Sequence, residues 1–260
     1  MDIFFTYENA TIGLLALLSI ACLVIGSRAV AKLGLKQAVV RYLILFLFLA
    51  ALWILADILA KRNLFLFLSE EAIRLLPLFG ALFLSVLFLA ISAAFLPEKF
   101  PIRPWVILGL LALIAGLIME SGVLGIPRVA LQFGSFPVYR RRVIQGVIML
   151  GWLLVIAKMM QITLVAYRQA KRPLHKNRVG FWALSTLVIM IGDLLVFSGF
   201  SQGSLLHLVA GYIAGYVLVS HNLADVLQLV LRGFSNLMIT LFAAAFYALV
   251  IKYIHLLLDA

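Results

Sequence analysis

Long apolar runs, separated by short polar or basic segments, make up most of the chain. Eight of these runs are long enough to cross a bilayer as helices, because a span needs about 20 predominantly apolar residues. The fourth run begins at Trp105 and becomes less apolar from Glu120 onward. The pattern predicts an all-α, polytopic integral membrane protein with about eight transmembrane helices, or seven as the alternative, in one domain over residues 1–260. The other expected spans are residues 11–30, 37–60, 72–96, 143–166, 179–200, 205–220 and 237–257.

Two connections between the expected spans stand out. Residues 126–142 form the longest one, with 17 residues that close in three consecutive arginines. Connections of this length often carry or cover a functional site. Residues 167–178, YRQAKRPLHKNR, hold five Lys and Arg residues. Such a basic segment is typical of a cytoplasmic loop.

A further segment, at residues 222–235, has the pattern of an amphipathic helix. Leu223, Val226, Leu227 and Val230 recur at the spacing of one helical face. We expect a short interfacial helix here, with an extension of a neighbouring span as the alternative.

Composition supports the membrane interpretation and excludes a water-soluble domain. Hydrophobic residues make up 65% of the chain and charged residues 12%, whereas soluble domains carry about 25% charged residues. The net charge is +11. Because the cations gather at span ends, we expect them to contact the anionic lipid of the bilayer, and we expect no nucleic-acid partner. Cys22 is the only cysteine, so an intramolecular disulfide is excluded.

The distribution of cations predicts an orientation. Arg28, Lys32 and Lys36 follow the first span, whereas the first ten residues contain no Lys or Arg. We therefore expect no cleaved leader, and an N-terminus outside the cytoplasm of a prokaryotic cell, with the protein in the cytoplasmic membrane. With that orientation, twelve Lys and Arg residues lie on the inner side and seven on the outer side.

Two ionisable residues inside the expected spans suggest a pair. Charged groups at membrane depth are costly and mark functional positions by default. Lys158 in the fifth span and Asp193 in the sixth are close enough in depth for a flexible lysine to bridge them. We predict a Lys158–Asp193 pair in the interior of the bundle. The alternatives are a purely structural clasp or a lysine that extends to the interface.

A second group of ionisable residues collects toward the expected outer face and predicts a ligand pocket there. Helix ends that are simply hydrated are the alternative. No nucleotide loop, metal-binding set or Ser/His/Asp set is recognisable, so we expect no catalytic residue, no metal and no cofactor, although an intramembrane enzyme stays an open option. The residues of this predicted pocket are Asp57, Arg74, Glu120, His207 and His255.

Three stretches resemble a known family. YRQAKRPLHKNRVGFWAL, the Gly192–Asp193 pair and GYVLVSHNLADVLQLVLRG are similar to the multi-pass membrane sensor regions at the N-terminus of bacterial histidine kinases and related signalling proteins. The resemblance covers mainly residues 166–240. It implies that Asp193 is the matching acidic position and that residues 222–232 transmit a helix movement to catalytic domains. The candidate transmitting residues are Leu223, Asp225, Val226, Leu227, Val230 and Arg232.

From these features we expect a membrane-embedded sensory or signal-input module without a catalytic domain of its own, since no kinase segment follows before Ala260. A transporter or channel for a small solute, with Lys158, Asp193 and Glu120 as its polar pathway, is one alternative. An accessory subunit of a membrane complex is another. A protein partner or a second copy of the chain is compatible with each of these functions, and the sequence does not identify a ligand.

Overall fold

The structure is a computed structural model that describes residues 2–61, 70–96, 101–120, 129–133 and 136–220. Contacts divide the chain into two units, Met1–Ser220 and His221–Ala260, and every described helix belongs to the first. The expected eighth span, at residues 237–257, and the expected interfacial helix, at residues 222–235, lie outside the described residues. The single-domain organisation therefore stays a prediction.

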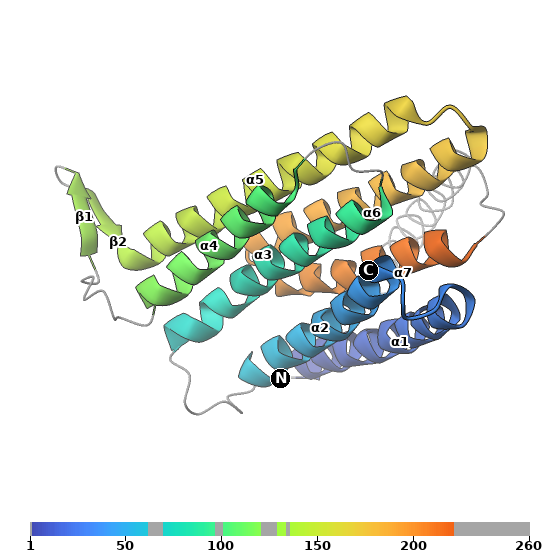
Figure 1. Cartoon of the computed structure of the whole chain (residues 1–260). Helices are drawn as coiled ribbons and strands as arrows, with labels where there is room; N and C mark the ends of the chain where they lie inside the picture. The colour runs from blue at the N-terminus through green and yellow to red at the C-terminus, as the bar shows by residue number, and fades with distance from the viewer. Residues whose placement is uncertain (1, 62–69, 97–100, 121–128, 134–135, 221–260) are drawn as a thin grey trace, which may run out of the picture. The chain divides into compact units, whose positions relative to one another are not determined.

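The described part of this first unit contains seven α-helices, and each has a segment long and apolar enough to cross a membrane. Figure 1 shows them as long rods that run side by side. The all-α, polytopic membrane class is thereby confirmed, with seven spans in the described part of the chain. The helices are α1 (Asp2–Leu33), α2 (Ala38–Lys61), α3 (Glu70–Phe95), α4 (Arg103–Glu120), α5 (Arg140–Gln169), α6 (Pro173–Phe197) and α7 (Leu205–Val219).

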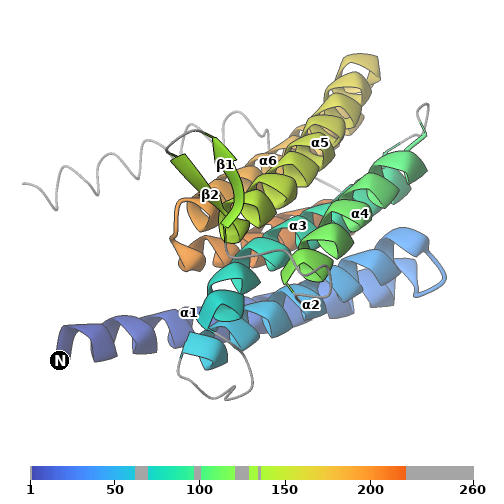
Figure 2. The same ribbon diagram turned by 90° about the vertical axis from the view of Figure 1, so that its left-hand side faces the viewer.

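The long connection expected at residues 126–142 contains a small antiparallel hairpin. Strand β1 (Val129–Phe133) pairs with β2 (Phe136–Tyr139), and the register shifts between Val129 and Leu131. Figures 1 and 2 both show the hairpin at the N-terminal end of α5. Valine, phenylalanine and tyrosine favour extended backbone, which explains this departure from an otherwise helical fold. The three arginines assigned to the connection belong to the first turn of α5.

The basic segment at residues 167–178 is mostly helical, which corrects the expected loop. Helix α5 continues to Gln169 and α6 already begins at Pro173. Proline suits the first turn of a helix because its fixed φ fits and its missing N–H would be unpaired there. At the other end, α6 stops at Phe197, and Gly199 adopts a φ of 95° soon afterwards. This left-handed conformation favours glycine and directs the chain out of the helix.

Helix α3 is the centre of the bundle. It packs against α2, α4, α5 and α6, and 67% of its membrane window is buried, compared with 11% for α4. Trp182 of α6 stacks on Phe95 and Phe88 of α3, with ring centroids 4.2 and 5.5 Å apart. The indole N–H of Trp182 also donates to Ser92 Oγ, 2.9 Å away. These contacts fix α6 against the C-terminal half of α3.

Glycines let α4 approach its neighbours closely. A Cβ atom on Gly109 of α4 would lie 2.4 Å from Val86 Cγ2 of α3 and 2.8 Å from Val155 Cγ2 of α5. A Cβ on Gly151 of α5 would lie 2.5 Å from the Cβ of Ala112. Small residues of this kind let membrane helices associate by close backbone packing.

Adding one methyl group at this contact tests the packing. We expect Gly109→Ala to lower the free energy of unfolding by about 1–3 kcal/mol, because β-branched Val86 and Val155 have little rotamer freedom to yield. Thermal unfolding in detergent measures the change. Gly146→Ala on α5 is the control, since a Cβ there meets nothing within 4 Å and alanine favours helix. Equal stability of the two variants would contradict this close packing of α4.

Candidate functional site

One carboxylate, that of Asp193 on α6, lies fully buried among polar side chains of other elements. Its exposed fraction is 0%. Its Oδ2 atom accepts hydrogen bonds from Ser85 Oγ of α3 and from Trp152 Nε1 of α5, each at 2.6 Å. Burying a polar group costs free energy unless hydrogen bonds replace those it made to water. The two donors therefore offset part of the cost of burying this carboxyl group.

The imidazole of His207, on α7, faces the other carboxylate oxygen. His207 Nε2 lies 2.9 Å from Asp193 Oδ1, and both side chains are 0% exposed. Neither of these two atoms makes a hydrogen bond among the described residues, so the contact is a close approach of two polar atoms rather than a hydrogen bond. The opposite ring nitrogen, Nδ1, lies 3.0 Å from the carbonyl oxygen of Ser204. Ser204 ends the 3₁₀ helix η1 (Ser201–Ser204) that precedes α7.

Two glycines explain how His207 reaches Asp193. A Cβ atom on Gly203 would lie 2.4 Å from the backbone oxygen of Gly192, and one on Gly192 would lie 2.7 Å from the backbone oxygen of Gly203. Only a residue without a side chain permits this approach, so η1 lies directly on the backbone of α6. Each glycine immediately precedes a residue of the site, Asp193 or Ser204. The close approach therefore positions the start of α7 beside the carboxylate.

Both donors to Asp193 Oδ2, Ser85 and Trp152, extend from their own helices to α6. Other buried hydroxyls, such as those of Ser92, Ser185 and Thr186, donate to the carbonyl oxygen four residues earlier in their own helix, whereas that of Ser85 crosses from α3 to α6. The Trp152 ring packs edge-on against Phe197, with centroids 5.0 Å apart. The carboxylate thus links α3, α5, α6 and α7.

The predicted Lys158–Asp193 pair is not formed. Lys158 Nζ donates to Gln161 Oε1, 3.0 Å away on the same helix, and lies 5.5 Å from the centre of the Trp105 ring. Lys158 lies 11 residues before the end of α5, and Asp193 lies 20 residues after the start of α6. In antiparallel neighbours this is an offset of about 14 Å along the axis. Trp152 lies closer to the level of Asp193, and its indole takes the place predicted for the lysine.

The residues of the predicted outer pocket do not gather in one described site. His207 belongs to the Asp193 cluster. Asp57, near the end of α2, is 5% exposed, and Glu120, the last residue of α4, is half-buried. Arg74 lies near the start of α3, where side chains are not described, and His255 lies outside the described residues. All six candidate transmitting residues between Leu223 and Arg232 also lie outside the described residues.

Sequence reasoning missed Ser85 and Trp152. A signal existed for the tryptophan: Trp152 lies in the middle of a span, away from the interfaces where tryptophan is usual, and a buried indole N–H generally has a partner. Ser85 offered only a single hydroxyl within an apolar run. A lone serine in a membrane helix most often bonds its own backbone, so this residue could not be distinguished from the others.

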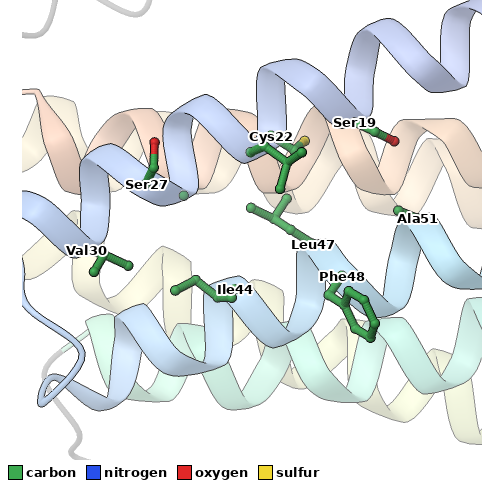
Figure 3. Close-up of a pocket in the computed structure, with 10 residues that line it drawn as sticks. Ser19, Cys22, Ser27, Val30, Ile44, Leu47, Phe48 and Ala51 are labelled. Atoms are coloured by element: carbon green, nitrogen blue, oxygen red, sulfur yellow. The ribbon is translucent and has the colours of Figure 1, made fainter.

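A groove of about 450 Å³ lies between α1 and α2. Figure 3 shows Cys22 and Ser27 of α1 opposite Leu47 and Phe48 of α2. Two of its polar side chains already have partners: Ser27 Oγ donates to the carbonyl oxygen of Val24 at 2.9 Å, and Cys22 Sγ to that of Leu208 at 3.5 Å. Phe48 is 62% exposed. The groove is an outward-facing apolar surface, and no charged side chain lines it.

The chemistry of the Asp193 cluster follows from which groups are bonded. Ser85 donates to the carboxylate and not to His207, so the imidazole is not arranged as a base for the serine hydroxyl. Among the residues that the structure describes, no group of three or more His, Cys, Asp or Glu side chains could hold a metal ion.

Comparisons with protein-family models, curated proteins and solved structures find no match for this chain.

The observed partner of Asp193 can be distinguished from the predicted one by double-mutant cycles. We expect Trp152→Phe and Asp193→Asn to be coupled by about 0.5–3 kcal/mol in the free energy of unfolding, because the two side chains are in direct contact. Lys158→Met and Asp193→Asn should be additive, since Lys158 bonds elsewhere. Unfolding of the purified variants in mixed micelles measures both cycles. Coupling in the lysine cycle and additivity in the tryptophan cycle would contradict the site.

Proposed function

We propose that the protein is a membrane-embedded sensory or signal-input module. Its sensing element is the Asp193 cluster, and α7 transmits the movement to residues 222–232. The observation that carries the proposal is the position of His207. It lies in the first turn of α7, contacts a fully buried carboxylate on α6, and is on the helix that leads directly toward the candidate transmitting segment.

The opposite end of α7 is also held by charged side chains. Lys32 of α1 donates to the carbonyl oxygen of Val219, and Arg178 of α6 donates to that of Ser220, 2.9 Å away. Cations at a helix C-terminus stabilise its unpaired carbonyls. Both ends of α7 therefore depend on interactions with ionisable residues of α1 and α6. This arrangement supports a helix whose position responds to a change of charge at the cluster.

The family resemblance supports the same function. Asp193 is the acidic position that the resemblance assigns to the sixth span, and it is the residue on which the polar contacts converge. A buried polar group of this kind can bias a two-state helix arrangement when its interactions change. Coupling to a cytoplasmic catalytic partner, on another chain or a further segment, is part of this proposal.

The orientation and the membrane belong to the proposal as well. The ends of α1, α3, α5 and α7 and the starts of α2, α4 and α6 lie on one side of the bundle, together with Arg28, Lys32, Arg168 and Lys176. This excess of cations supports a cytoplasmic location for that side and an N-terminus on the outside, in a prokaryotic cytoplasmic membrane. A reporter fused after Lys176 should then report the cytoplasm.

A transporter or channel for a small solute is the second candidate. The observation in its favour is the burial of Asp193 and His207, because ionisable groups at membrane depth often mark ion or proton pathways. Lys158 and Glu120, the other members of the expected pathway, do not contact Asp193 in the described part of the chain.

A spin label in the candidate transmitting segment tests the sensory function. In a Cys22→Ser background, we place a label at Val226→Cys and reconstitute the protein in vesicles. We expect Asp193→Asn and His207→Gln to change the mobility and accessibility of the label, because either change alters the polar contact between Asp193 of α6 and His207 of α7. Electron paramagnetic resonance measures both quantities.

Ser185→Ala is the matched control for the label, since Ser185 is a buried residue of α6 that bonds only its own helix. It should leave the spectrum unchanged. Identical spectra in all folded variants would contradict the sensory function. Solute flux into the same vesicles that stops in Asp193→Asn would favour the transporter instead.

A further inference from the structure

We infer that the groove between α1 and α2 binds one anionic phospholipid, with an acyl chain along the groove and the phosphate beside Lys36 and Arg41. The groove has a volume of about 450 Å³, and no charged side chain lines it. Exposed apolar side chains form its rims, Leu23 on α1 and Phe48 on α2. Its ligand must therefore be apolar where it contacts these walls, and the acyl chains of the surrounding bilayer meet this requirement.

The length of the groove matches the chain of a single lipid. On α1 the groove extends from Ser19 to Val30, which is about 16 Å along the helix axis. The hydrocarbon core of a bilayer is about 30 Å thick, so one leaflet supplies about 15 Å of acyl chain. On α2 the groove extends from Ile44 to Ala51. It thus begins near the ends of the two spans and reaches just past their middle.

Two exposed cations lie beyond the end of the groove that is nearest to the membrane surface. Figure 3 shows Val30 and Ile44 at this end, where the chain passes from α1 to α2. Arg41 precedes Ile44 on α2 by one turn, and Lys36 lies in the connection between the helices. One turn, about 4.5 Å, separates the apolar walls from the guanidinium, and the glycerol ester of a phospholipid fits this interval.

These cations select the charge of the lipid. Arginine binds a phosphate group through two parallel hydrogen bonds, and basic side chains near the membrane surface attract lipids with a net negative charge. Both Lys36 and Arg41 are exposed. A lipid with an anionic headgroup is therefore held at both of its parts, whereas a zwitterionic lipid gains less from the two cations.

The other cations at this end of α1 do not serve the groove. Arg28 follows Gly26, a residue of the groove wall, by two positions, which places it about 200° around the helix. It is exposed on the opposite face of α1. Lys32 donates to the carbonyl oxygen of Val219 on α7. Arg28 consequently provides a control cation at a similar depth but outside the groove.

Photocrosslinking in vesicles identifies the occupant of the groove. We replace Phe48 by benzoylphenylalanine in the full chain, reconstitute it in phosphatidylcholine with a minor share of phosphatidylglycerol, and identify the captured species by mass spectrometry. We expect phosphatidylglycerol to be captured in excess of its share of the vesicle lipid. The control position is Leu111, which is exposed on α4 outside the groove. There, the two lipids should be captured in the ratio in which the vesicles contain them.

Two variants test the acyl and the headgroup contacts separately. Gly26→Leu fills the groove without a clash at the backbone, because a Cβ atom there meets only Leu47 Cδ1, 4.0 Å away. It should abolish the excess of phosphatidylglycerol although both cations remain. Arg41→Gln should lower the excess about five-fold, the contribution of one cation near the membrane surface.

Each variant has a matched control. Gly13→Leu adds the same side chain to α1 where a Cβ atom meets nothing within 4 Å, and Arg28→Gln removes a cation on the opposite face of that helix. Both should retain the excess of phosphatidylglycerol at position 48. Capture of this lipid only in proportion to its share would overturn the inference, even if a variant does not fold. Capture of residues 237–257 or of a second copy of the chain in its place would do the same, as would an excess that survives both Gly26→Leu and Arg41→Gln.

Discussion

The arrangement of four helices depends on the burial of one carboxylate. A carboxyl group in apolar surroundings is costly unless polar groups compensate it. Asp193 accepts hydrogen bonds from Ser85 and Trp152 and lies 2.9 Å from His207, and these residues lie on three other helices. A displacement of any one of these helices would remove a polar contact from the carboxyl group. The carboxylate therefore selects this packing among the many that apolar surfaces alone would permit.

Glycine contacts set the distances that this network requires. The approach of Gly192 and Gly203 brings η1 onto the backbone of α6, and without it His207 could not lie 2.9 Å from the carboxylate. Close glycine packing also holds α4 against α3 and α5 through Gly109 and Gly151. Apolar packing in a membrane is weakly selective because lipid is as apolar as the side chains, so the specificity of this bundle comes from small residues and polar contacts.

The sequence was sufficient for the class of fold and for seven of its spans, because apolar runs of bilayer length leave few alternatives. It also identified Asp193 and His207 as costly polar residues. Their pairing was not predictable, since it depends on the offset of neighbouring helices, and the boundaries of α5 and α6 differed from the expected ones by several residues. That difference moved Lys158 away from the level of Asp193. Ser85 carried no signal at all, because a serine that bonds another helix has the same pattern as one that bonds its own.

Polar contacts at both ends distinguish α7 from a helix that is held by apolar packing alone. In its first turn, His207 Nε2 lies 2.9 Å from Asp193 Oδ1, and Nδ1 lies 3.0 Å from the carbonyl oxygen of Ser204. At its C-terminal end, Lys32 donates to the carbonyl oxygen of Val219 and Arg178 to that of Ser220. Because apolar packing between membrane helices is weakly selective, these polar contacts determine where α7 lies against α1 and α6.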